Sequence, residues 1–120
     1  MQQLECPLYV LSPRRSVFLN MLIYNVTVGV DKKIEQEWVI WMKEIHIPAV
    51  MATRMFISYK MYQVLTDDDG GSVSYATQYS AKSLNEVEIY LEKFAPALRD
   101  EVKKKFGDQQ ASFRTLLEEV

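Results

Sequence analysis

Residues 21–30, MLIYNVTVGV, alternate between two faces, and this pattern constrains the fold more than any other feature of the chain. One face holds only apolar and aromatic residues: Leu22, Tyr24, Val26, Val28 and Val30. The other face, which begins at Ile23, is half polar. Period-two alternation with β-branched residues is typical of a strand with one buried face. We therefore predict a sheet whose first strand is residues 21–30.

A helix is predicted to follow this strand, because Asp31 can accept hydrogen bonds from the free N–H groups of a first helical turn. Apolar residues then recur at helical spacing and form one stripe: Ile34, Trp38, Trp41, Met42, Ile45 and Ala49. Pro48 cannot continue the hydrogen-bond ladder and restrains Ile47 before it. We predict that this helix ends or kinks near His46, with a short turn of helix over residues 48–52.

Residues 54–65 and 73–80 are predicted to be the second and third strands. The segment TDDDGGS at residues 66–72 joins them as a hairpin turn, with glycines available for positive φ. Asp67, Asp68 and Asp69 also suggest calcium, but an EF-hand loop needs alternating ligands and a closing glutamate, and residue 78 is glutamine. A solvated turn is the preferred interpretation.

A second helix is predicted to begin at the capping box formed by Ser83 and Glu86. Its apolar stripe consists of Leu84, Val87, Leu91, Phe94, Leu98, Val102 and Phe106. Pro96 is predicted to split the helix into two segments. Three lysines at 103–105 and Gly107 mark its end, because cations suit the carbonyl end of a helix and glycine suits its cap. Residues 110–118 form the last strand.

The predicted order is β-α-β-β-α-β, which indicates an α+β, ferredoxin-like fold with a four-stranded antiparallel sheet. Two helices can cover only one face of such a sheet. The second and third strands carry more apolar and aromatic residues than one face can hold: Met55, Phe56, Ile57, Tyr59, Met61, Tyr62, Tyr75 and Tyr79. We therefore predict that a second copy of the chain covers the other face and that the protein is a homodimer.

Composition excludes several classes of function. The formal net charge is −2 over 120 residues, and the basic residues are scattered apart from those at 103–105, so nucleic acid is not an expected partner. Cys6 is the only cysteine, which suits a reducing compartment, and we expect a cytoplasmic protein without a membrane partner.

Residues 1–20 show no clear period and are expected to be a disordered extension, or to precede a true start at Met21. The domain is then residues 21–120.

Several segments resemble a bacterial family known only as a domain of unknown function: MLIYNVTVGVD at 21–31, WMKEIHIPAVMAT at 41–53, FAPALRDEVKKKFG at 94–107 and FRTLLE at 113–118. More distantly, a helix that ends in His-x-Pro before a second strand resembles the dimeric α/β-barrel superfamily. That superfamily includes cofactor-independent monooxygenases, EthD-like and NIPSNAP-like proteins, and muconolactone isomerases. The resemblance implies a ferredoxin-like fold paired into a dimeric α/β barrel, and it implies no particular activity.

His46, the only histidine, lies at the edge of the first helical stripe and is a candidate general base or ligand-binding residue. The alternative is a structural histidine at a helix end.

A pocket for a planar, partly polar molecule is predicted to be lined by Tyr24, Asn25, Tyr59 and Tyr75. The alternative is that these residues serve ordinary sheet packing.

Further motifs for chemistry are absent from the sequence. It contains no glycine-rich phosphate loop and no Cys/His cluster with metal spacing, so no metal or cofactor is expected. We favour a dimer that binds a small aromatic or polar molecule without catalysis. The alternatives are a cofactor-independent enzyme of the monooxygenase or isomerase type with His46 as general base, and a module that binds a protein partner through its acidic helices.

Overall fold

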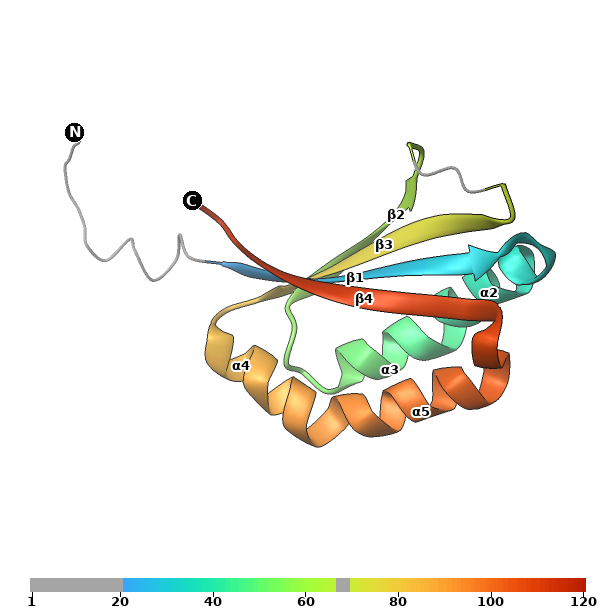
Figure 1. Cartoon of the computed structure of the whole chain (residues 1–120). Coiled ribbons are helices and arrows are strands. Elements are labelled where there is room, and N and C mark those ends of the chain that lie inside the picture. Colours follow the sequence, from blue (N-terminus) through green and yellow to red (C-terminus); the bar gives the residue numbers. More distant parts are fainter. Residues whose placement is uncertain (1–20, 67–69) are drawn as a thin grey trace.

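The computed structural model describes residues 21–66 and 70–120, which form one sheet and two helical arms (Figure 1). The strands are β1 (Leu22–Asp31), β2 (Ser58–Val64), β3 (Ser72–Ala81) and β4 (Gln110–Glu118). The first arm consists of η1 (Lys32–Ile34), α2 (Glu35–Trp41), η2 (Met42–His46) and α3 (Ile47–Ala52). The second arm consists of α4 (Leu84–Ile89), η3 (Tyr90–Phe94), α5 (Ala95–Phe106) and η4 (Gly107–Gln109). The predicted extension at 1–20 and the turn residues 67–69 lie outside the described residues.

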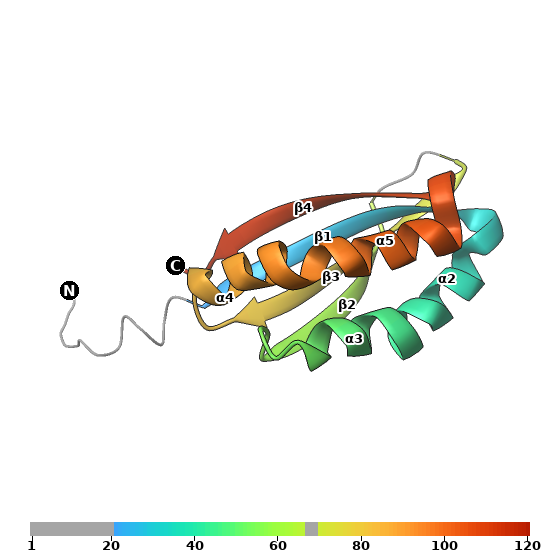
Figure 2. The ribbon, with the colours of Figure 1, turned by 90° about the horizontal axis from the view of Figure 1, so that it is seen from below.

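The strands form one sheet in the order β2-β3-β1-β4, and every neighbouring pair is antiparallel. Both helical arms lie on the same face of this sheet (Figure 2). The predicted α+β, ferredoxin-like fold with a four-stranded antiparallel sheet is therefore confirmed. In the described residues, no helix is long and apolar enough to cross a membrane.

The core lies between this sheet face and the two arms. In β1 the predicted alternation is confirmed, since Leu22, Tyr24, Val28 and Val30 are all buried. The arms contribute the other main core residues: Trp38, Met42, Ile47, Val50, Val87, Tyr90, Ala95 and Phe106. Burial of such side chains from both layers holds the arms against the sheet, at about 1.5–3 kcal/mol for each large apolar side chain.

Each helical arm contains a wide turn just before a proline. The N–H of Ile47 donates to the carbonyl of Met42, and the N–H of Ala95 donates to that of Tyr90, so each bond spans five residues instead of four. A proline in a regular helix has no N–H to donate and crowds the carbonyl four residues before it. The wide turns, η2 and η3, relieve that conflict. The helices therefore change their hydrogen bonding before the prolines and continue to Ala52 and Phe106.

The wide turns also shift the apolar stripes. The buried residues of the first arm are Trp38, Met42, Ile47 and Val50, with a spacing of five across η2. Ile45 is 50% exposed, so its predicted place in the stripe is wrong. In the second arm the same shift buries Tyr90 and Ala95 and leaves Leu91 exposed. A stripe drawn at constant helical spacing fails at both places because the helix is locally wider.

The second strand begins later than predicted. Arg54 has a positive φ of 65°, and its N–H donates to the carbonyl of Met51 at 3.1 Å, which ends the first arm. Phe56 then fills the core in the connection between arm and strand, and β2 starts at Ser58. The prediction of a strand from residue 54 is therefore wrong over residues 54–57, where the chain turns from the arm into the sheet.

The predicted caps differ in outcome. The carboxylate of Asp31 accepts from the N–H of Lys33 at 2.9 Å, as predicted. The hydroxyl of Ser83 donates to the carboxylate of Glu86 and makes no bond to the backbone of the helix, so the two predicted residues bond to each other and the predicted capping box is not formed. Gly107 adopts a φ of 58° at the end of α5, in the positive region that glycine tolerates.

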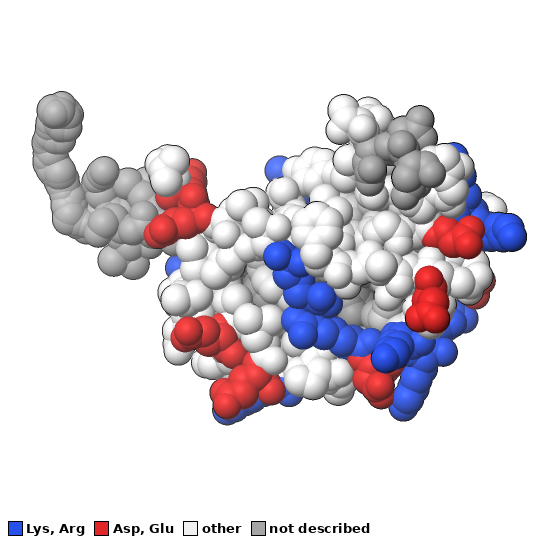
Figure 3. Space-filling view, viewed as in Figure 1, with Lys and Arg blue, Asp and Glu red and all other residues white. Residues whose placement is uncertain are grey.

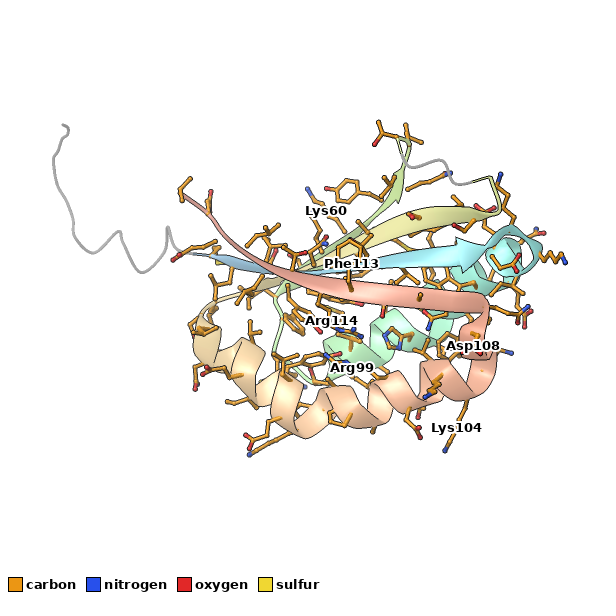
Figure 4. The ribbon with its side chains drawn as sticks, viewed as in Figure 1. Lys60, Arg99, Lys104, Asp108, Phe113 and Arg114 are labelled. Carbon is orange, nitrogen blue, oxygen red and sulfur yellow. The ribbon has the colours of Figure 1, made fainter. Side chains whose placement is uncertain are left out.

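The face of the sheet opposite the arms, here called the open face, is not covered by either arm, since both arms lie below the sheet (Figure 1). Phe113 on β4 and Lys60 on β2 lie on this side (Figure 4). Phe113 is 62% exposed, Leu117 is 42% exposed and Tyr62 is 47% exposed. The aromatic excess predicted for the second and third strands lies mainly on the helix side, where Phe56 and Tyr79 are buried. The apolar part of the open face comes largely from β4 instead.

Candidate functional site

A cavity of about 320 Å³ lies between the sheet and the helical arms. Its apolar and aromatic wall consists of Tyr24, Val26, Val28, Met42, Tyr79, Tyr90 and Val102. Its polar lining consists of His46, Thr77, Arg99, Lys103, Asp108, Gln110, Ser112 and Arg114. A cavity of this size, in which an apolar and aromatic wall faces a set of converging polar groups, is typical of a small-molecule site.

The register of the sheet brings β1 and β4 together in the cavity wall. Val26 pairs with Arg114, and Val28 pairs with Ser112. Because side chains alternate across a strand, these residues point to the same face as Tyr24. The polar residues of β4 therefore face the arms, whereas Phe113 between them faces the open side. The strand that borders the cavity thus supplies its cationic group.

Two guanidinium groups converge on one hydroxyl in the cavity. Arg99 of α5 donates to the Tyr24 hydroxyl at 3.2 Å, and Nε of Arg114 donates to the same oxygen at 3.0 Å. Arg114 also donates to the hydroxyl of Ser112 at 3.3 Å. Figure 4 shows the two arginines approaching from opposite sides, from the helix below and the strand above. One tyrosine oxygen therefore fixes the position of two positive charges.

The positive charge of the cavity has no carboxylate partner. Among the residues that the structure describes, the ion pairs are Lys104–Asp100 and Lys105–Glu37, and neither includes an arginine of the cavity. Figure 3 shows Lys and Arg side chains gathered in a band along the gap between β4 and α5. A guanidinium carries five N–H donors, and few of these are used here. The arrangement can receive an anion by bidentate hydrogen bonds.

His46 lies in the wide turn η2 and borders the same cavity. Its ring stacks on Trp41 with a centroid distance of 5.8 Å and an interplanar angle of 22°. Burial of the ring, and secondarily the positive charge of Arg114, lower the pKa of His46 from 6.5 to about 4. The imidazole is therefore neutral at pH 7.

The tyrosines of the cavity are packed together, and burial keeps two of them, Tyr79 and Tyr90, protonated. Tyr24 contacts Tyr90 at 5.7 Å, Tyr79 at 6.3 Å and Phe56 at 5.8 Å between ring centroids. Burial raises the pKa of Tyr79 well above its usual range. Burial, aided by Tyr24, raises the pKa of Tyr90 to about 12 against the opposing charges of the two arginines. These hydroxyls are neutral groups that can donate or accept hydrogen bonds.

The structure does not bring all the residues predicted from the sequence together. His46 and Tyr24 both border the cavity. Asn25 lies on the open face, where its amide donates to the Thr27 hydroxyl at 2.9 Å. Tyr59 lies on the outer strand β2 and contacts Tyr79. Tyr75 donates its hydroxyl to Glu35 at 2.5 Å, away from the cavity lining.

The two arginines were not anticipated from the sequence. A signal for Arg114 exists, because Gln110, Ser112 and Arg114 occupy alternate positions of the last strand opposite the apolar face of β1. Polar residues at inward positions of a strand indicate a cavity rather than a packed core. Arg99 gives no such signal, since it is one of many charged residues on its helix. In the described part of the chain, no group of His, Cys, Asp and Glu could hold a metal ion.

Known structures with the same fold include two EthD proteins. An ethyl tert-butyl ether D (EthD) family protein from Bacillus halodurans has a TM-score of 0.63 and 10% identity, covering 82% of this chain and 99% of that one. An EthD-like protein from Ralstonia eutropha has a TM-score of 0.60 and 13% identity, covering 84% and 93%. A Bacillus cereus protein provisionally named an antibiotic biosynthesis monooxygenase has a TM-score of 0.57 and 11% identity, covering 82% and 92%. At such identities the likeness shows the fold alone.

Sequence comparison gives a more direct relationship. No curated protein has a significant sequence match to the chain. The sequence profile of one family, described as a domain of unknown function (DUF4286), matches residues 21–120. These residues include every strand and helix described above, as well as the segments in which the sequence resembled such a family. The chain therefore belongs to the DUF4286 family, a family of domains of unknown function.

Proposed function

We propose that the protein binds a small organic anion with an aromatic or apolar body in the cavity between its sheet and its helical arms. The observation that carries this proposal is the pair of guanidinium groups of Arg99 and Arg114 on the hydroxyl of Tyr24, neither of which forms an ion pair with a carboxylate of residues 21–66 or 70–120. The tyrosine and valine wall beside them suits an aromatic ring. A carboxylate would lie against the arginines and the ring would lie against this wall.

A direct test measures binding of benzoate and salicylate to the full chain by calorimetry and thermal shift. We expect both acids to raise the melting temperature and benzamide, their uncharged analogue, to have little effect. A ligand at 100 times its Kd stabilises the folded state by about 2.7 kcal/mol. A domain of about 100 residues should then melt on the order of 10 °C higher.

Variants of the arginines separate specific recognition from general attraction. Arg99→Gln and Arg114→Gln should each weaken benzoate binding by roughly 10- to 100-fold, since a hydrogen bond to a charged group contributes about 1.5–3 kcal/mol. Lys104→Gln is the matched control, because it removes one positive charge from α5 outside the cavity, where Lys104 pairs with Asp100. Equal losses in all three variants would contradict the proposal.

The proposed function includes a homodimer in which the open faces of two sheets pack together. On the open face, the side chain of Phe113 is exposed. Beside it on the same face lies a patch of small residues, which consists of Gly29, Ser74, Ala76 and Ala111. Each copy has both features, so a two-fold arrangement can place the ring of one copy over the small residues of the other. The exposed Leu117 on the same face adds apolar area.

Sedimentation equilibrium tests this dimer. The wild-type chain should be a dimer at micromolar concentration, and Phe113→Ser should shift it to a monomer with a preserved circular dichroism spectrum. Leu65→Ser is the control, because Leu65 is 85% exposed and lies beyond the end of β2. A wild-type chain that sediments as a folded monomer would rule out the dimer.

The alternative function, a cofactor-independent monooxygenase- or isomerase-like enzyme with His46 as general base, makes a specific demand on this residue. To accept a proton from a ligand in the cavity, the ring nitrogen that faces the cavity must be unprotonated. The other nitrogen then carries the proton of the neutral imidazole and needs an acceptor. Incorporation of deuterium from D₂O into an aromatic β-keto acid, lost in His46→Gln, would support this alternative.

A further inference from the structure

The two ring nitrogens of His46 have different surroundings. Nδ1 is fully enclosed and has no hydrogen-bond partner among the described residues. Nε2 is not enclosed in this way, and His46 makes no side-chain hydrogen bond within the described part of the chain, so Nε2 is the nitrogen that opens to the cavity. The surroundings of the ring therefore distinguish the two places where its single proton can reside.

We infer that His46 carries its proton on Nε2 and is a hydrogen-bond donor to the ligand, which makes the ligand group an acceptor such as a carboxylate. A buried N–H without an acceptor is among the rarest arrangements in folded proteins, whereas a buried acceptor without a donor is tolerated more often. A proton on Nδ1 would be such an orphan, because nothing around it accepts. A proton on Nε2 can instead be solvated by water in the cavity or donated to a ligand.

Arg114 acts on the charge of the ring and not on the choice between the two nitrogens. Its positive charge lies close enough to His46 to oppose protonation of the ring. A bound carboxylate reverses this influence, because it neutralises the guanidinium and offers an acceptor to Nε2–H at the same time. The ligand thus completes an arrangement in which three groups of the cavity donate to it: Arg99, Arg114 and His46.

This assignment deepens the proposed function and rests on it only for the identity of the ligand. It excludes an ammonium as the ligand group, since an ammonium has no lone pair that could accept from three donors. It also separates His46 from a general base, whose cavity-facing nitrogen must be free to accept. His46 is then a specificity residue, which adds one neutral donor to two charged ones.

The experiment is a two-bond ¹H–¹⁵N correlation spectrum of the full chain labelled with ¹⁵N-histidine. The chain has one histidine, so the two imidazole nitrogens are identified without ambiguity. We expect the spectrum at pH 7 to show a neutral ring with its proton on Nε2, both in the free protein and with saturating benzoate. A proton on Nδ1 in the benzoate-bound protein overturns the inference.

A second measurement compares two variants that are close in size. His46→Gln keeps an N–H donor near the place of Nε2, whereas His46→Met does not. Benzoate affinity should fall on the order of tenfold in His46→Met and recover in His46→Gln. Equal affinities of the two variants would overturn the donor role. If benzoate binds neither variant nor the wild type, the proposed anion function fails, and the tautomer of the free protein then decides this inference separately.

Discussion

Replacement of Gly29 by alanine should have opposite effects on the stability of one protomer and on the association of two. Gly29 lies in the middle of β1 on the open face, and its backbone does not need a positive φ. A Cβ built on it would lie 3.9 Å from Oγ of Ser74 and 4.0 Å from the carbonyl oxygen of Ala111, which are ordinary contacts. The fold of a single chain therefore gives no reason for a glycine at this position.

The stabilising effect can be estimated from the unfolded state. An alanine has fewer backbone conformations than a glycine, so Gly29→Ala should stabilise the protomer by about 0.4–1 kcal/mol. For a domain of about 100 residues this raises the melting temperature by roughly 2–8 °C. The measurement is best made in the Phe113→Ser background, where the expected monomer removes the concentration dependence that dimerisation adds.

The effect on association has the opposite sign. Two packed sheets approach to about 10 Å, and each copy would add a methyl group where the small residues permit close contact. Overfilling a packed interface costs about 1–3 kcal/mol. The dimer should therefore dissociate at a concentration roughly 5- to 150-fold higher, measured by sedimentation equilibrium. An unchanged dimer Kd would refute the idea that the two copies meet at Gly29, and a destabilised monomer would show that the added methyl group does not fit within one chain.

Three further predictions follow from the site. Tyr24→Phe removes the hydroxyl that accepts from Arg99 and Arg114. The free energy of unfolding, measured in urea, should fall by about 1 kcal/mol without a change in m-value, because cavity water can replace part of the lost hydrogen bonds. As the pH falls from 6.5 to 4, an unfolded chain protonates His46 and the folded chain does not, so stability should fall more steeply in wild type than in His46→Gln. Above pH 10 the unfolded chain loses the Tyr90 proton, which the folded chain holds up to about 12, so stability should fall with rising pH and fall less in Tyr90→Phe; parallel curves would contradict either assignment.

The elements of this fold were predictable where side-chain periodicity was regular. The alternation of residues 21–30 identified β1, and the order of strands and helices then determined the fold. The prediction that Ile45 and Leu91 belong to the buried stripes was wrong, because a wide turn adds one residue to the helix. No local sequence pattern distinguishes such a wide turn from a proline kink. The predicted start of β2 was wrong because Arg54 adopts a left-handed backbone conformation, which an arginine does not indicate in a sequence.

The candidate site was only partly visible in the sequence. His46 and Tyr24 were identified because an isolated histidine and a tyrosine on an apolar strand face are conspicuous. Their arginine neighbours come from α5 and β4, which are 75 and 90 residues from Tyr24 along the chain. Contacts of that separation depend on strand pairing and on how the second arm lies over the sheet. A single sequence specifies neither the strand pairing nor the position of the second arm accurately enough to predict an individual hydrogen bond.

The two wide turns restrict how sequences of this kind can change in length. In a regular helix one residue corresponds to a rotation of about 100°. Deletion of a single residue such as Glu44 would place Ile47 four residues after Met42 in a regular helix, with Ile47 and Val50 still on the core face, but Pro48 would then crowd the carbonyl four residues before it. Insertions should therefore accumulate in the hairpin between β2 and β3, whereas the number of residues from Trp38 to Pro48, and from Val87 to Pro96, should stay constant among relatives. Gaps in an alignment across those two intervals would indicate a misplaced alignment or a different helix.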